Sequence, residues 1–226
     1  MTARSASRSS ECIVAVFAKA PHPGAVKTRL AARIGASAAA ELHARLVRRT
    51  LDTATRAAIG PVELWCASSA EEAFFHEMDR EFGASRFTQS TGDLGERMSQ
   101  AVAQALGRAS CVVLIGTDCL DLTPTDLREA SAALAAGADV VLGPAEDGGY
   151  YLIGQRHNEP RVFEGIAWST DRVLAQTRQR LAALGLHWQE LPERWDLDRP
   201  EDYDRLLADP ELAPLAAGLI KANVPS

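Results

Sequence analysis

The sequence predicts an α/β protein, a three-layer α/β/α sandwich with a mostly parallel central sheet. Short segments rich in Val, Ile and Leu alternate along the chain with segments whose apolar residues recur at helical spacing. Some of the short segments, such as VVLI at 112–115, are apolar without alternation, which is typical of strands buried on both faces of a parallel sheet.

Each expected strand is an apolar run that ends at glycine, proline or polar residues. The strands cover 12–18, 62–67, 86–89, 112–115, 139–143, 150–153 and 186–191. Several helices have a recognisable start: Thr123 and Asp126 form a capping-box pattern around Pro124, and Glu201 and Asp202 suit the dipole of a first turn. The helices cover 37–57, 70–82, 94–108, a segment beginning at 124, 170–184 and 200–207, with a short helical turn at 26–30 and a weak terminal helix at 212–220.

Composition indicates a globular protein with one core. The chain has 226 residues, 46% hydrophobic and 24% charged, and its net charge of −6 does not favour a nucleic-acid partner. We expect a disordered tail at 1–10, because this segment is basic and rich in serine, and a single domain at 11–226. The four cysteines lack metal-binding spacing, and no segment reaches the length of a membrane span, so we expect a cytoplasmic protein with reduced thiols and no membrane partner.

A cationic loop follows the first strand. Lys19, Lys27 and Arg29 surround a Pro/Gly segment that includes Gly24, and a helix start follows at once. Free N–H groups at a helix start and charged side chains both favour phosphate oxygens, so these four residues are candidate nucleotide contacts. Neither GxxxxGK[ST] nor GxGxxG is present. The alternative is a set of scattered surface cations.

A second candidate segment combines Gln89 with Gly92, Asp93, Leu94 and Gly95. Glycines allow close backbone approach to a flat ligand, and the Gln amide offers both a donor and an acceptor to a base edge. The alternative is an ordinary helix start punctuated by glycines.

Acids follow the buried strand at 112–115 and recur near the end of the chain. Asp118, Asp196 and Asp198 could share Mg²⁺ or Mn²⁺ with substrate phosphates if their segments meet at one edge of the sheet. Asp118 could instead cap its turn, and Asp198 could cap the helix that begins at Pro200. We assign Asp121 to support of the turn rather than to metal binding.

A further loop carries Asp147, Gly148 and Gly149 before Tyr150, and Trp168 lies downstream. The glycines leave room for a ligand, and an acid beside it could act as a general base. The alternative is a tight turn with core tyrosines, and for Tyr151 we favour that assignment.

Taken together, AKAPHPGAVKTRL, TGDLGERM, GTDCLDL, GPAEDGGYYLIG, FEGIAWST and WDLDRPED resemble the radical-SAM/selenodomain-associated transferase 1 family. That family is glycosyltransferase-like and belongs to the nucleotide-diphospho-sugar transferase superfamily, with the glycosyltransferase A fold. The likeness covers about 13–207. The KTRL element also resembles that of 2-phospholactate guanylyltransferases.

The resemblance implies a role for each candidate segment. Lys27 and Arg29 would contact nucleotide phosphates, and Gln89 with the loop at 92–95 would meet the base. Asp118 would bind the metal, completed by Asp196 and Asp198, and the segment 147–150 would line the acceptor pocket. Arg199 departs from the Thr expected there, which makes Asp198 a less secure ligand.

Three functions remain open at this stage. The leading hypothesis is a metal-dependent glycosyltransferase that moves a sugar from a nucleotide sugar to a small-molecule acceptor, with Asp118, Asp147 and Lys27 as catalytic residues. The second is a nucleotidyltransferase that joins a nucleoside triphosphate to a phosphorylated small molecule and releases pyrophosphate. The third is a nucleotide-binding regulatory protein without catalysis.

Overall fold

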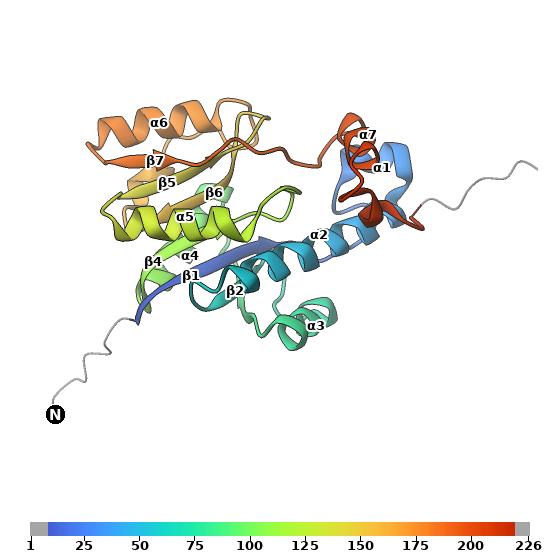
Figure 1. The fold of residues 1–226 in the computed structure, drawn as a ribbon, viewed down its shortest axis with the longest axis horizontal. Coiled ribbons are helices and arrows are strands. Elements are labelled where there is room, and N and C mark those ends of the chain that lie inside the picture. The colour runs from blue at the N-terminus through green and yellow to red at the C-terminus, as the bar shows by residue number, and fades with distance from the viewer. Residues whose placement is uncertain (1–8, 220–226) are drawn as a thin grey trace, which may run out of the picture.

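The computed structural model describes residues 9–219, which form a seven-stranded sheet covered by helices on both faces (Figure 1). The sheet order is β3-β2-β1-β4-β6-β5-β7, and every strand except β6 runs parallel to the others, as the sequence predicted. The strands are β1 (Ser9–Ala18), β2 (Val62–Cys66), β3 (Ser85–Thr88), β4 (Ala109–Ile115), β5 (Val140–Pro144), β6 (Tyr150–Gln155) and β7 (Trp188–Glu190).

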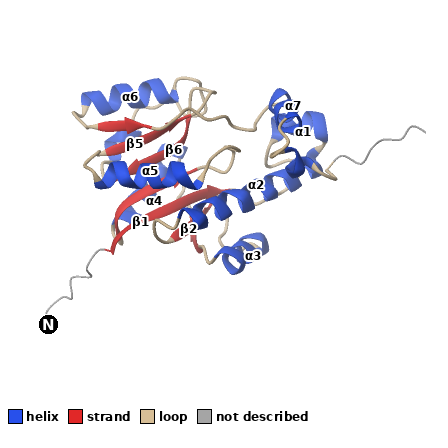
Figure 2. Ribbon diagram, viewed as in Figure 1, coloured by secondary structure: helices blue, strands red, loops and turns tan. Residues whose placement is uncertain are grey.

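The helices divide into two layers and a separate group beyond the strand ends (Figure 2). Apolar residues of α2, α3 and α5 pack on one face of the sheet, and those of α4 and α6 pack on the other. The helices are α1 (Thr28–Ile34), α2 (Ala36–Ala57), α3 (Ala73–Phe82), α4 (Leu94–Leu106), α5 (Pro124–Ala135), α6 (Val173–Ala183) and α7 (Pro200–Ala208), with 3₁₀ turns η1 (Pro160–Phe163) and η2 (Ala213–Ala216).

A third apolar cluster packs α1 and α2 against the C-terminal segment that contains α7. Leu30 of α1 and Leu42 of α2 pack with Trp195 and with Tyr203 of α7. This cluster places α7 beside α1, away from the strands, as Figure 1 shows. The segment after β7 is thereby held across the carboxyl end of the sheet, and it carries Asp196 and Asp198.

Several boundaries differ from the expectation. Of the expected tail, residues 1–8 lie outside the described residues, whereas Ser9 and Ser10 belong to β1. The expected helix start at 70 is three residues early, because Glu72 is the N-cap of α3. Within residues 212–219 only the short η2 forms, and Ile220 lies outside the described residues.

The β5–β6 connection explains why one strand is antiparallel. It is a hairpin across 145–149, in which Gly148 adopts φ +85°, a left-handed conformation that favours glycine. A Cβ atom at Gly148 would also come within 2.2 Å of the Asp171 carbonyl oxygen. Because β6 turns back, the hairpin lies at the same edge of the sheet as the carboxyl ends of β1 and β4, where ligands of α/β sheets collect.

Candidate active site

A cleft of about 1100 Å³ lies at this carboxyl edge. It is bounded by the loop after β1, the loop after β4, the β5–β6 hairpin, the segment 168–173 and the segment 195–202. Of the predicted site residues, those that line it are Lys19, Lys27, Arg29, Gln89, Leu94, Asp118, Asp147, Gly149, Tyr150, Trp168, Asp196 and Asp198.

Lys27 is the buried cation of the site. Its side chain is only 3% exposed, and its Nζ lies 2.7 Å from Oδ1 of Asp118 and donates to the carbonyl of Leu197. Its backbone has φ +48°, so α1 begins immediately after a left-handed residue. Lys27 therefore ties the loop after β1 to β4 and to the C-terminal segment.

Asp118 is ionised by this arrangement. Burial acts to raise its pKa, but the charge and hydrogen bond of Lys27 outweigh burial and hold the pKa below its usual value. The Asp118 side chain remains 48% exposed and faces the cleft. It is thus a charged acid at the mouth of β4, as the sequence predicted for a strand end.

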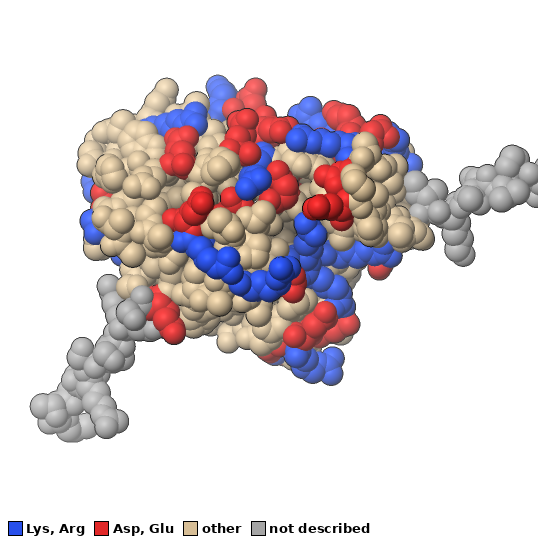
Figure 3. Space-filling model, viewed as in Figure 1, with Lys and Arg blue, Asp and Glu red and all other residues tan. Residues whose placement is uncertain are grey.

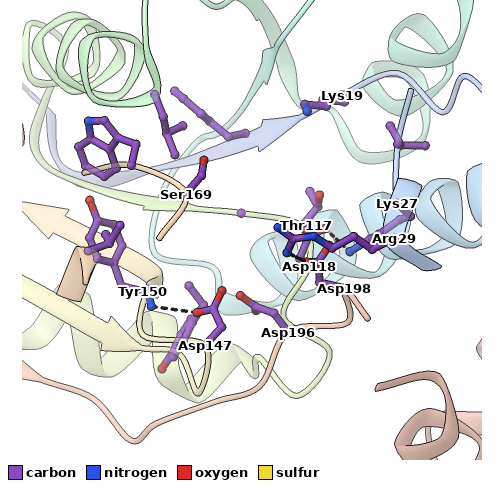
Figure 4. A pocket seen from close by; sticks show the side chains of 18 of the residues that line it. Lys19, Lys27, Arg29, Thr117, Asp118, Asp147, Tyr150, Ser169, Asp196 and Asp198 are labelled. Atoms are coloured by element: carbon purple, nitrogen blue, oxygen red, sulfur yellow. Dashed lines mark hydrogen bonds and ion pairs between the residues drawn. The ribbon is translucent and has the colours of Figure 1, made fainter. Parts of the chain in front are cut away.

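Arg29 and Lys19 complete the cationic side of the cleft (Figure 4). Arg29 donates to Asp198 at 2.6 Å, and both side chains are exposed. Lys19 is exposed and forms no ion pair within residues 9–219. Gly24 lies in the same loop with φ +79° but does not line the cleft, so its part is to allow the turn.

Asp196 lies between Asp118 and Asp147, as Figure 4 shows. Its pKa is raised to about 8, first by burial and then by the negative charges of Asp118 and Asp147. Its Oδ1 is buried and has no hydrogen-bond partner among the described residues. Buried carboxylates normally have a partner, so this oxygen is suited to a bound cation.

The acids fit a divalent cation in part. Asp118 and Asp196 face one space, and oxygen ligands of this kind suit Mg²⁺ or Mn²⁺. Within residues 9–219, however, no three Asp, Glu, His or Cys side chains already surround a common point. The carboxylates do not converge because Asp118 is paired with the Lys27 ammonium and Asp198 is paired with Arg29.

Replacing Asp196 should stabilise the protein in alkaline solution. An acid with a raised pKa in the folded state contributes stability that is present below about pH 4 and is lost as the pH rises through about 8. We therefore expect the free energy of unfolding of Asp196→Asn to match that of the wild type near pH 4 and to exceed it by several kcal/mol above pH 8. Urea unfolding across this pH range measures the difference. Asp52→Asn, on the exposed side of α2, is the control, and equal stability of Asp196→Asn and wild type at high pH would contradict the expectation.

The segment predicted to read the base is already hydrogen-bonded. Nε2 of Gln89 donates to the Trp65 carbonyl at 2.8 Å, and its Oε1 accepts from Arg97 at 3.0 Å. Asp93 caps α4 in a capping box with Glu96. Gly92, Asp93 and Gly95 do not line the cleft, so this segment presents Gln89, Leu94, Arg97 and Met98 to a ligand.

The predicted acceptor segment forms the opposite end of the cleft. Oδ1 of Asp147 accepts from the backbone N–H of Gly149 at 2.9 Å, which fixes the hairpin. The rings of Tyr150 and Trp168 meet edge to face at 6.5 Å, and Gly95 lies against the Trp168 indole. Gly148 allows the turn of the hairpin and does not line the cleft. Tyr151 is buried in the core, as expected, and also borders the cleft.

Several residues that line the cleft escaped the sequence analysis, among them His43 and Arg97. His43 of α2 is buried, its Nε2 lies 3.1 Å from the Lys19 carbonyl, and burial lowers its pKa although Asp118 opposes the shift. Its signal was a polar residue within the apolar stripe of Leu42 and Leu46. Arg97 was hidden because it falls on the exposed side of a helix, where arginine is ordinary.

Charge on the surrounding surface is mixed. Figure 3 shows Lys and Arg side chains interleaved with Asp and Glu on the face drawn, without one broad region of a single sign. None of the helices within residues 9–219 combines the length and apolar character needed to span a bilayer.

The chain is similar in sequence to a bacterial protein family and in structure to solved transferases. The sequence profile of a family described as "Uncharacterized protein conserved in bacteria (DUF2064)" matches residues 50–170. A solved structure from Desulfovibrio desulfuricans G20, provisionally described as a nucleotide-diphospho-sugar transferase, is 33% identical, with a TM-score of 0.76 over 84% of this chain and 83% of that chain. No curated protein matches the chain.

Two more distant structures share the fold alone. The 4-diphosphocytidyl-2C-methyl-D-erythritol synthase of Anaerococcus prevotii is 10% identical, with a TM-score of 0.58 over 90% of this chain and 97% of that chain. Glucosyl-3-phosphoglycerate synthase of Mycobacterium tuberculosis, solved with Mn²⁺, uridine diphosphate and glucosyl-3-phosphoglycerate, is 13% identical, with a TM-score of 0.51 over 88% and 76%. The fold is therefore of the glycosyltransferase A type, as predicted.

Proposed function

We propose that this chain, which belongs to the DUF2064 family of bacterial proteins, is a metal-dependent transferase that moves a sugar from a nucleotide sugar to a small-molecule acceptor. The observation that carries the proposal is the ion pair of the buried Lys27 with Asp118 at the carboxyl edge of the sheet. We further propose that the chain is related to the radical-SAM/selenodomain-associated transferases and that it acts in the cytoplasm.

Cations and acids have separate tasks in this mechanism. Lys27 and Arg29 bind the phosphates of the donor and stabilise the negative charge that develops on the departing nucleoside diphosphate. Asp118 and Asp196 would hold Mg²⁺ or Mn²⁺, which would supply further neutralisation of that charge. Asp198 would join them only by leaving Arg29.

The acceptor meets the other end of the cleft. Asp147 belongs to the hairpin and lies beside Asp196 of the C-terminal segment. It is placed to accept the proton of an acceptor hydroxyl. Tyr150 and Trp168 position the acceptor there, and Trp168 in turn rests on Gly95. Leu94 and the Gln89–Arg97 pair would contact the base.

Nucleotide and metal should bind synergistically. A phosphate that draws Lys27 away leaves Asp118 without its partner, and a divalent cation replaces the lost charge. We therefore expect Mn²⁺ and the donor together to raise the melting temperature by more than the sum of their separate effects. At about 100 times the Kd, the gain is roughly 3 kcal/mol, or several degrees. A thermal-shift screen of nucleotides and nucleotide sugars with and without Mn²⁺ measures this.

The products distinguish the functions. Release of a nucleoside diphosphate supports sugar transfer, whereas release of pyrophosphate from a nucleoside triphosphate would establish nucleotidyl transfer, which the same cations could serve. Tight nucleotide binding with no metal-stimulated turnover would leave a regulatory protein. If no nucleotide shifts the melting temperature under either condition, the proposal is wrong.

A further inference from the structure

The two ends of the cleft differ in charge. We infer, on the basis of the proposed function, that the acceptor is a hydroxylated small molecule without phosphate or carboxylate groups. Different segments of the chain build the two ends. One end would bind the phosphates of the donor, and the other would receive the acceptor.

Every Lys and Arg that lines the cleft lies on the donor side. These residues come from the loop after β1, from the start of α1, from α4 and from the turn before α7: Lys19, Lys27, Arg29, Arg97 and Arg199. They can bind the phosphates of a nucleotide, and none comes from the hairpin or from 168–173.

The acceptor side carries acids instead. The charged residues that line the cleft from the hairpin and from 168–173 are Glu146, Asp147 and Asp171. Glu146 is neutralised by Arg205 at 2.7 Å. Asp147 and Asp171 form no ion pair within residues 9–219. A phosphate placed here would meet like charges, and neither the hairpin nor the segment 168–173 contributes a Lys or Arg to the lining of the cleft, so binding would be disfavoured.

The remaining lining groups suit a sugar or another polyol. Tyr150 and Trp168 offer apolar ring surface to the cleft, whereas the Tyr150 hydroxyl is buried. Figure 4 shows Tyr150, Ser169 and Asp147 around one end of the cleft, with Lys19, Lys27 and Arg29 at the other. Hydroxyls and ionised carboxylates accept hydrogen bonds from acceptor hydroxyls, and from an amine where one is present.

Trp168 reports the charge of this end directly. We express each quenching constant of the Trp168 emission, obtained as the difference between wild type and Trp168→Phe, relative to that of free N-acetyltryptophanamide with the same ion. On this scale we expect caesium to quench at least three-fold more efficiently than iodide. The double variant Asp147→Asn/Asp171→Asn should remove that preference, whereas Asp52→Asn, on α2 and outside the cleft, should keep it. Equal or stronger quenching by iodide overturns the inference.

Turnover provides the second test. With the donor and Mn²⁺ saturating, we expect kcat/KM for glycerol, glucose and glucosamine to exceed that for their phosphate esters by at least ten-fold within each pair that reacts. A phosphorylated partner that reacts better overturns the inference while leaving the transferase function intact. Loss of donor binding, by contrast, would count against the proposed function and not against the charge of the acceptor end.

Discussion

Asp118→Asn should lower kcat/KM by about 1000-fold, equivalent to roughly 4 kcal/mol of transition-state stabilisation. The substitution keeps the shape of the side chain but removes the charge that pairs with Lys27 at 2.7 Å. Asp118 also faces Asp196 across the cleft, so the charge available to a divalent cation falls. Steady-state release of nucleoside diphosphate, with the folded state checked by circular dichroism, measures the effect.

Asp121 is the matched control for Asp118. It lies on the same turn, its carboxylate is 3.6 Å from Arg194, and it does not line the cleft. Asp121→Asn should change kcat/KM by less than about ten-fold, which corresponds to about 1.4 kcal/mol. Turnover by Asp118→Asn at nearly the wild-type rate would exclude Asp118 from metal binding and catalysis.

Lys27→Asn should weaken nucleotide binding by about 100-fold, or roughly 2.7 kcal/mol. Asn tolerates the left-handed backbone of residue 27, so the substitution removes the cation without adding strain. The pKa of Asp118 should rise as well, because Lys27 is the chief influence that lowers it. Calorimetric titration with the best nucleotide from the thermal-shift screen measures the affinity.

Two further variants make this result specific. Lys27→Gly removes the whole side chain at a backbone conformation that glycine adopts freely, and it should bind as weakly as Lys27→Asn. Arg33→Gln removes a cation six residues after Lys27 that pairs with Asp204 and does not line the cleft, so the affinity of this variant should stay within about three-fold of the wild type. Unchanged affinity in Lys27→Asn would remove this residue from the phosphate site.

The sheet could be predicted from the sequence because its strands are local apolar runs. The run at 112–115 is apolar throughout and lies in β4, buried between β1 and β6. The capping box at Thr123 likewise depends on neighbours three residues apart, and the structure contains it. The start of β4 at Ala109 and the end of α4 at Leu106 were misplaced, because both fall in a segment with no glycine or proline except Gly107.

The site was predictable only as far as single residues reveal chemistry. Acids and cations after strand ends indicate a phosphate and metal site, and the cleft contains them. Their pairing was not predictable: Arg29 joins Asp198 and Lys27 joins Asp118 through contacts made across the whole fold. His43 was missed for the same reason, since its contact with the Lys19 carbonyl depends on how α2 crosses the end of β1.

The bond from Lys27 to the Leu197 carbonyl joins residues that are 170 positions apart. Synthesis proceeds from the N-terminus, and early segments begin to fold while later ones are still being made. β1, β2 and β4 can pair before residues 195–204 exist, but the loop after β1 then has no Leu197, Asp198 or α7 to hold it. A nascent or truncated chain would thus possess a sheet without the proposed phosphate site, so that, under the proposed function, competence to bind a nucleotide would mark a chain whose translation has passed this segment.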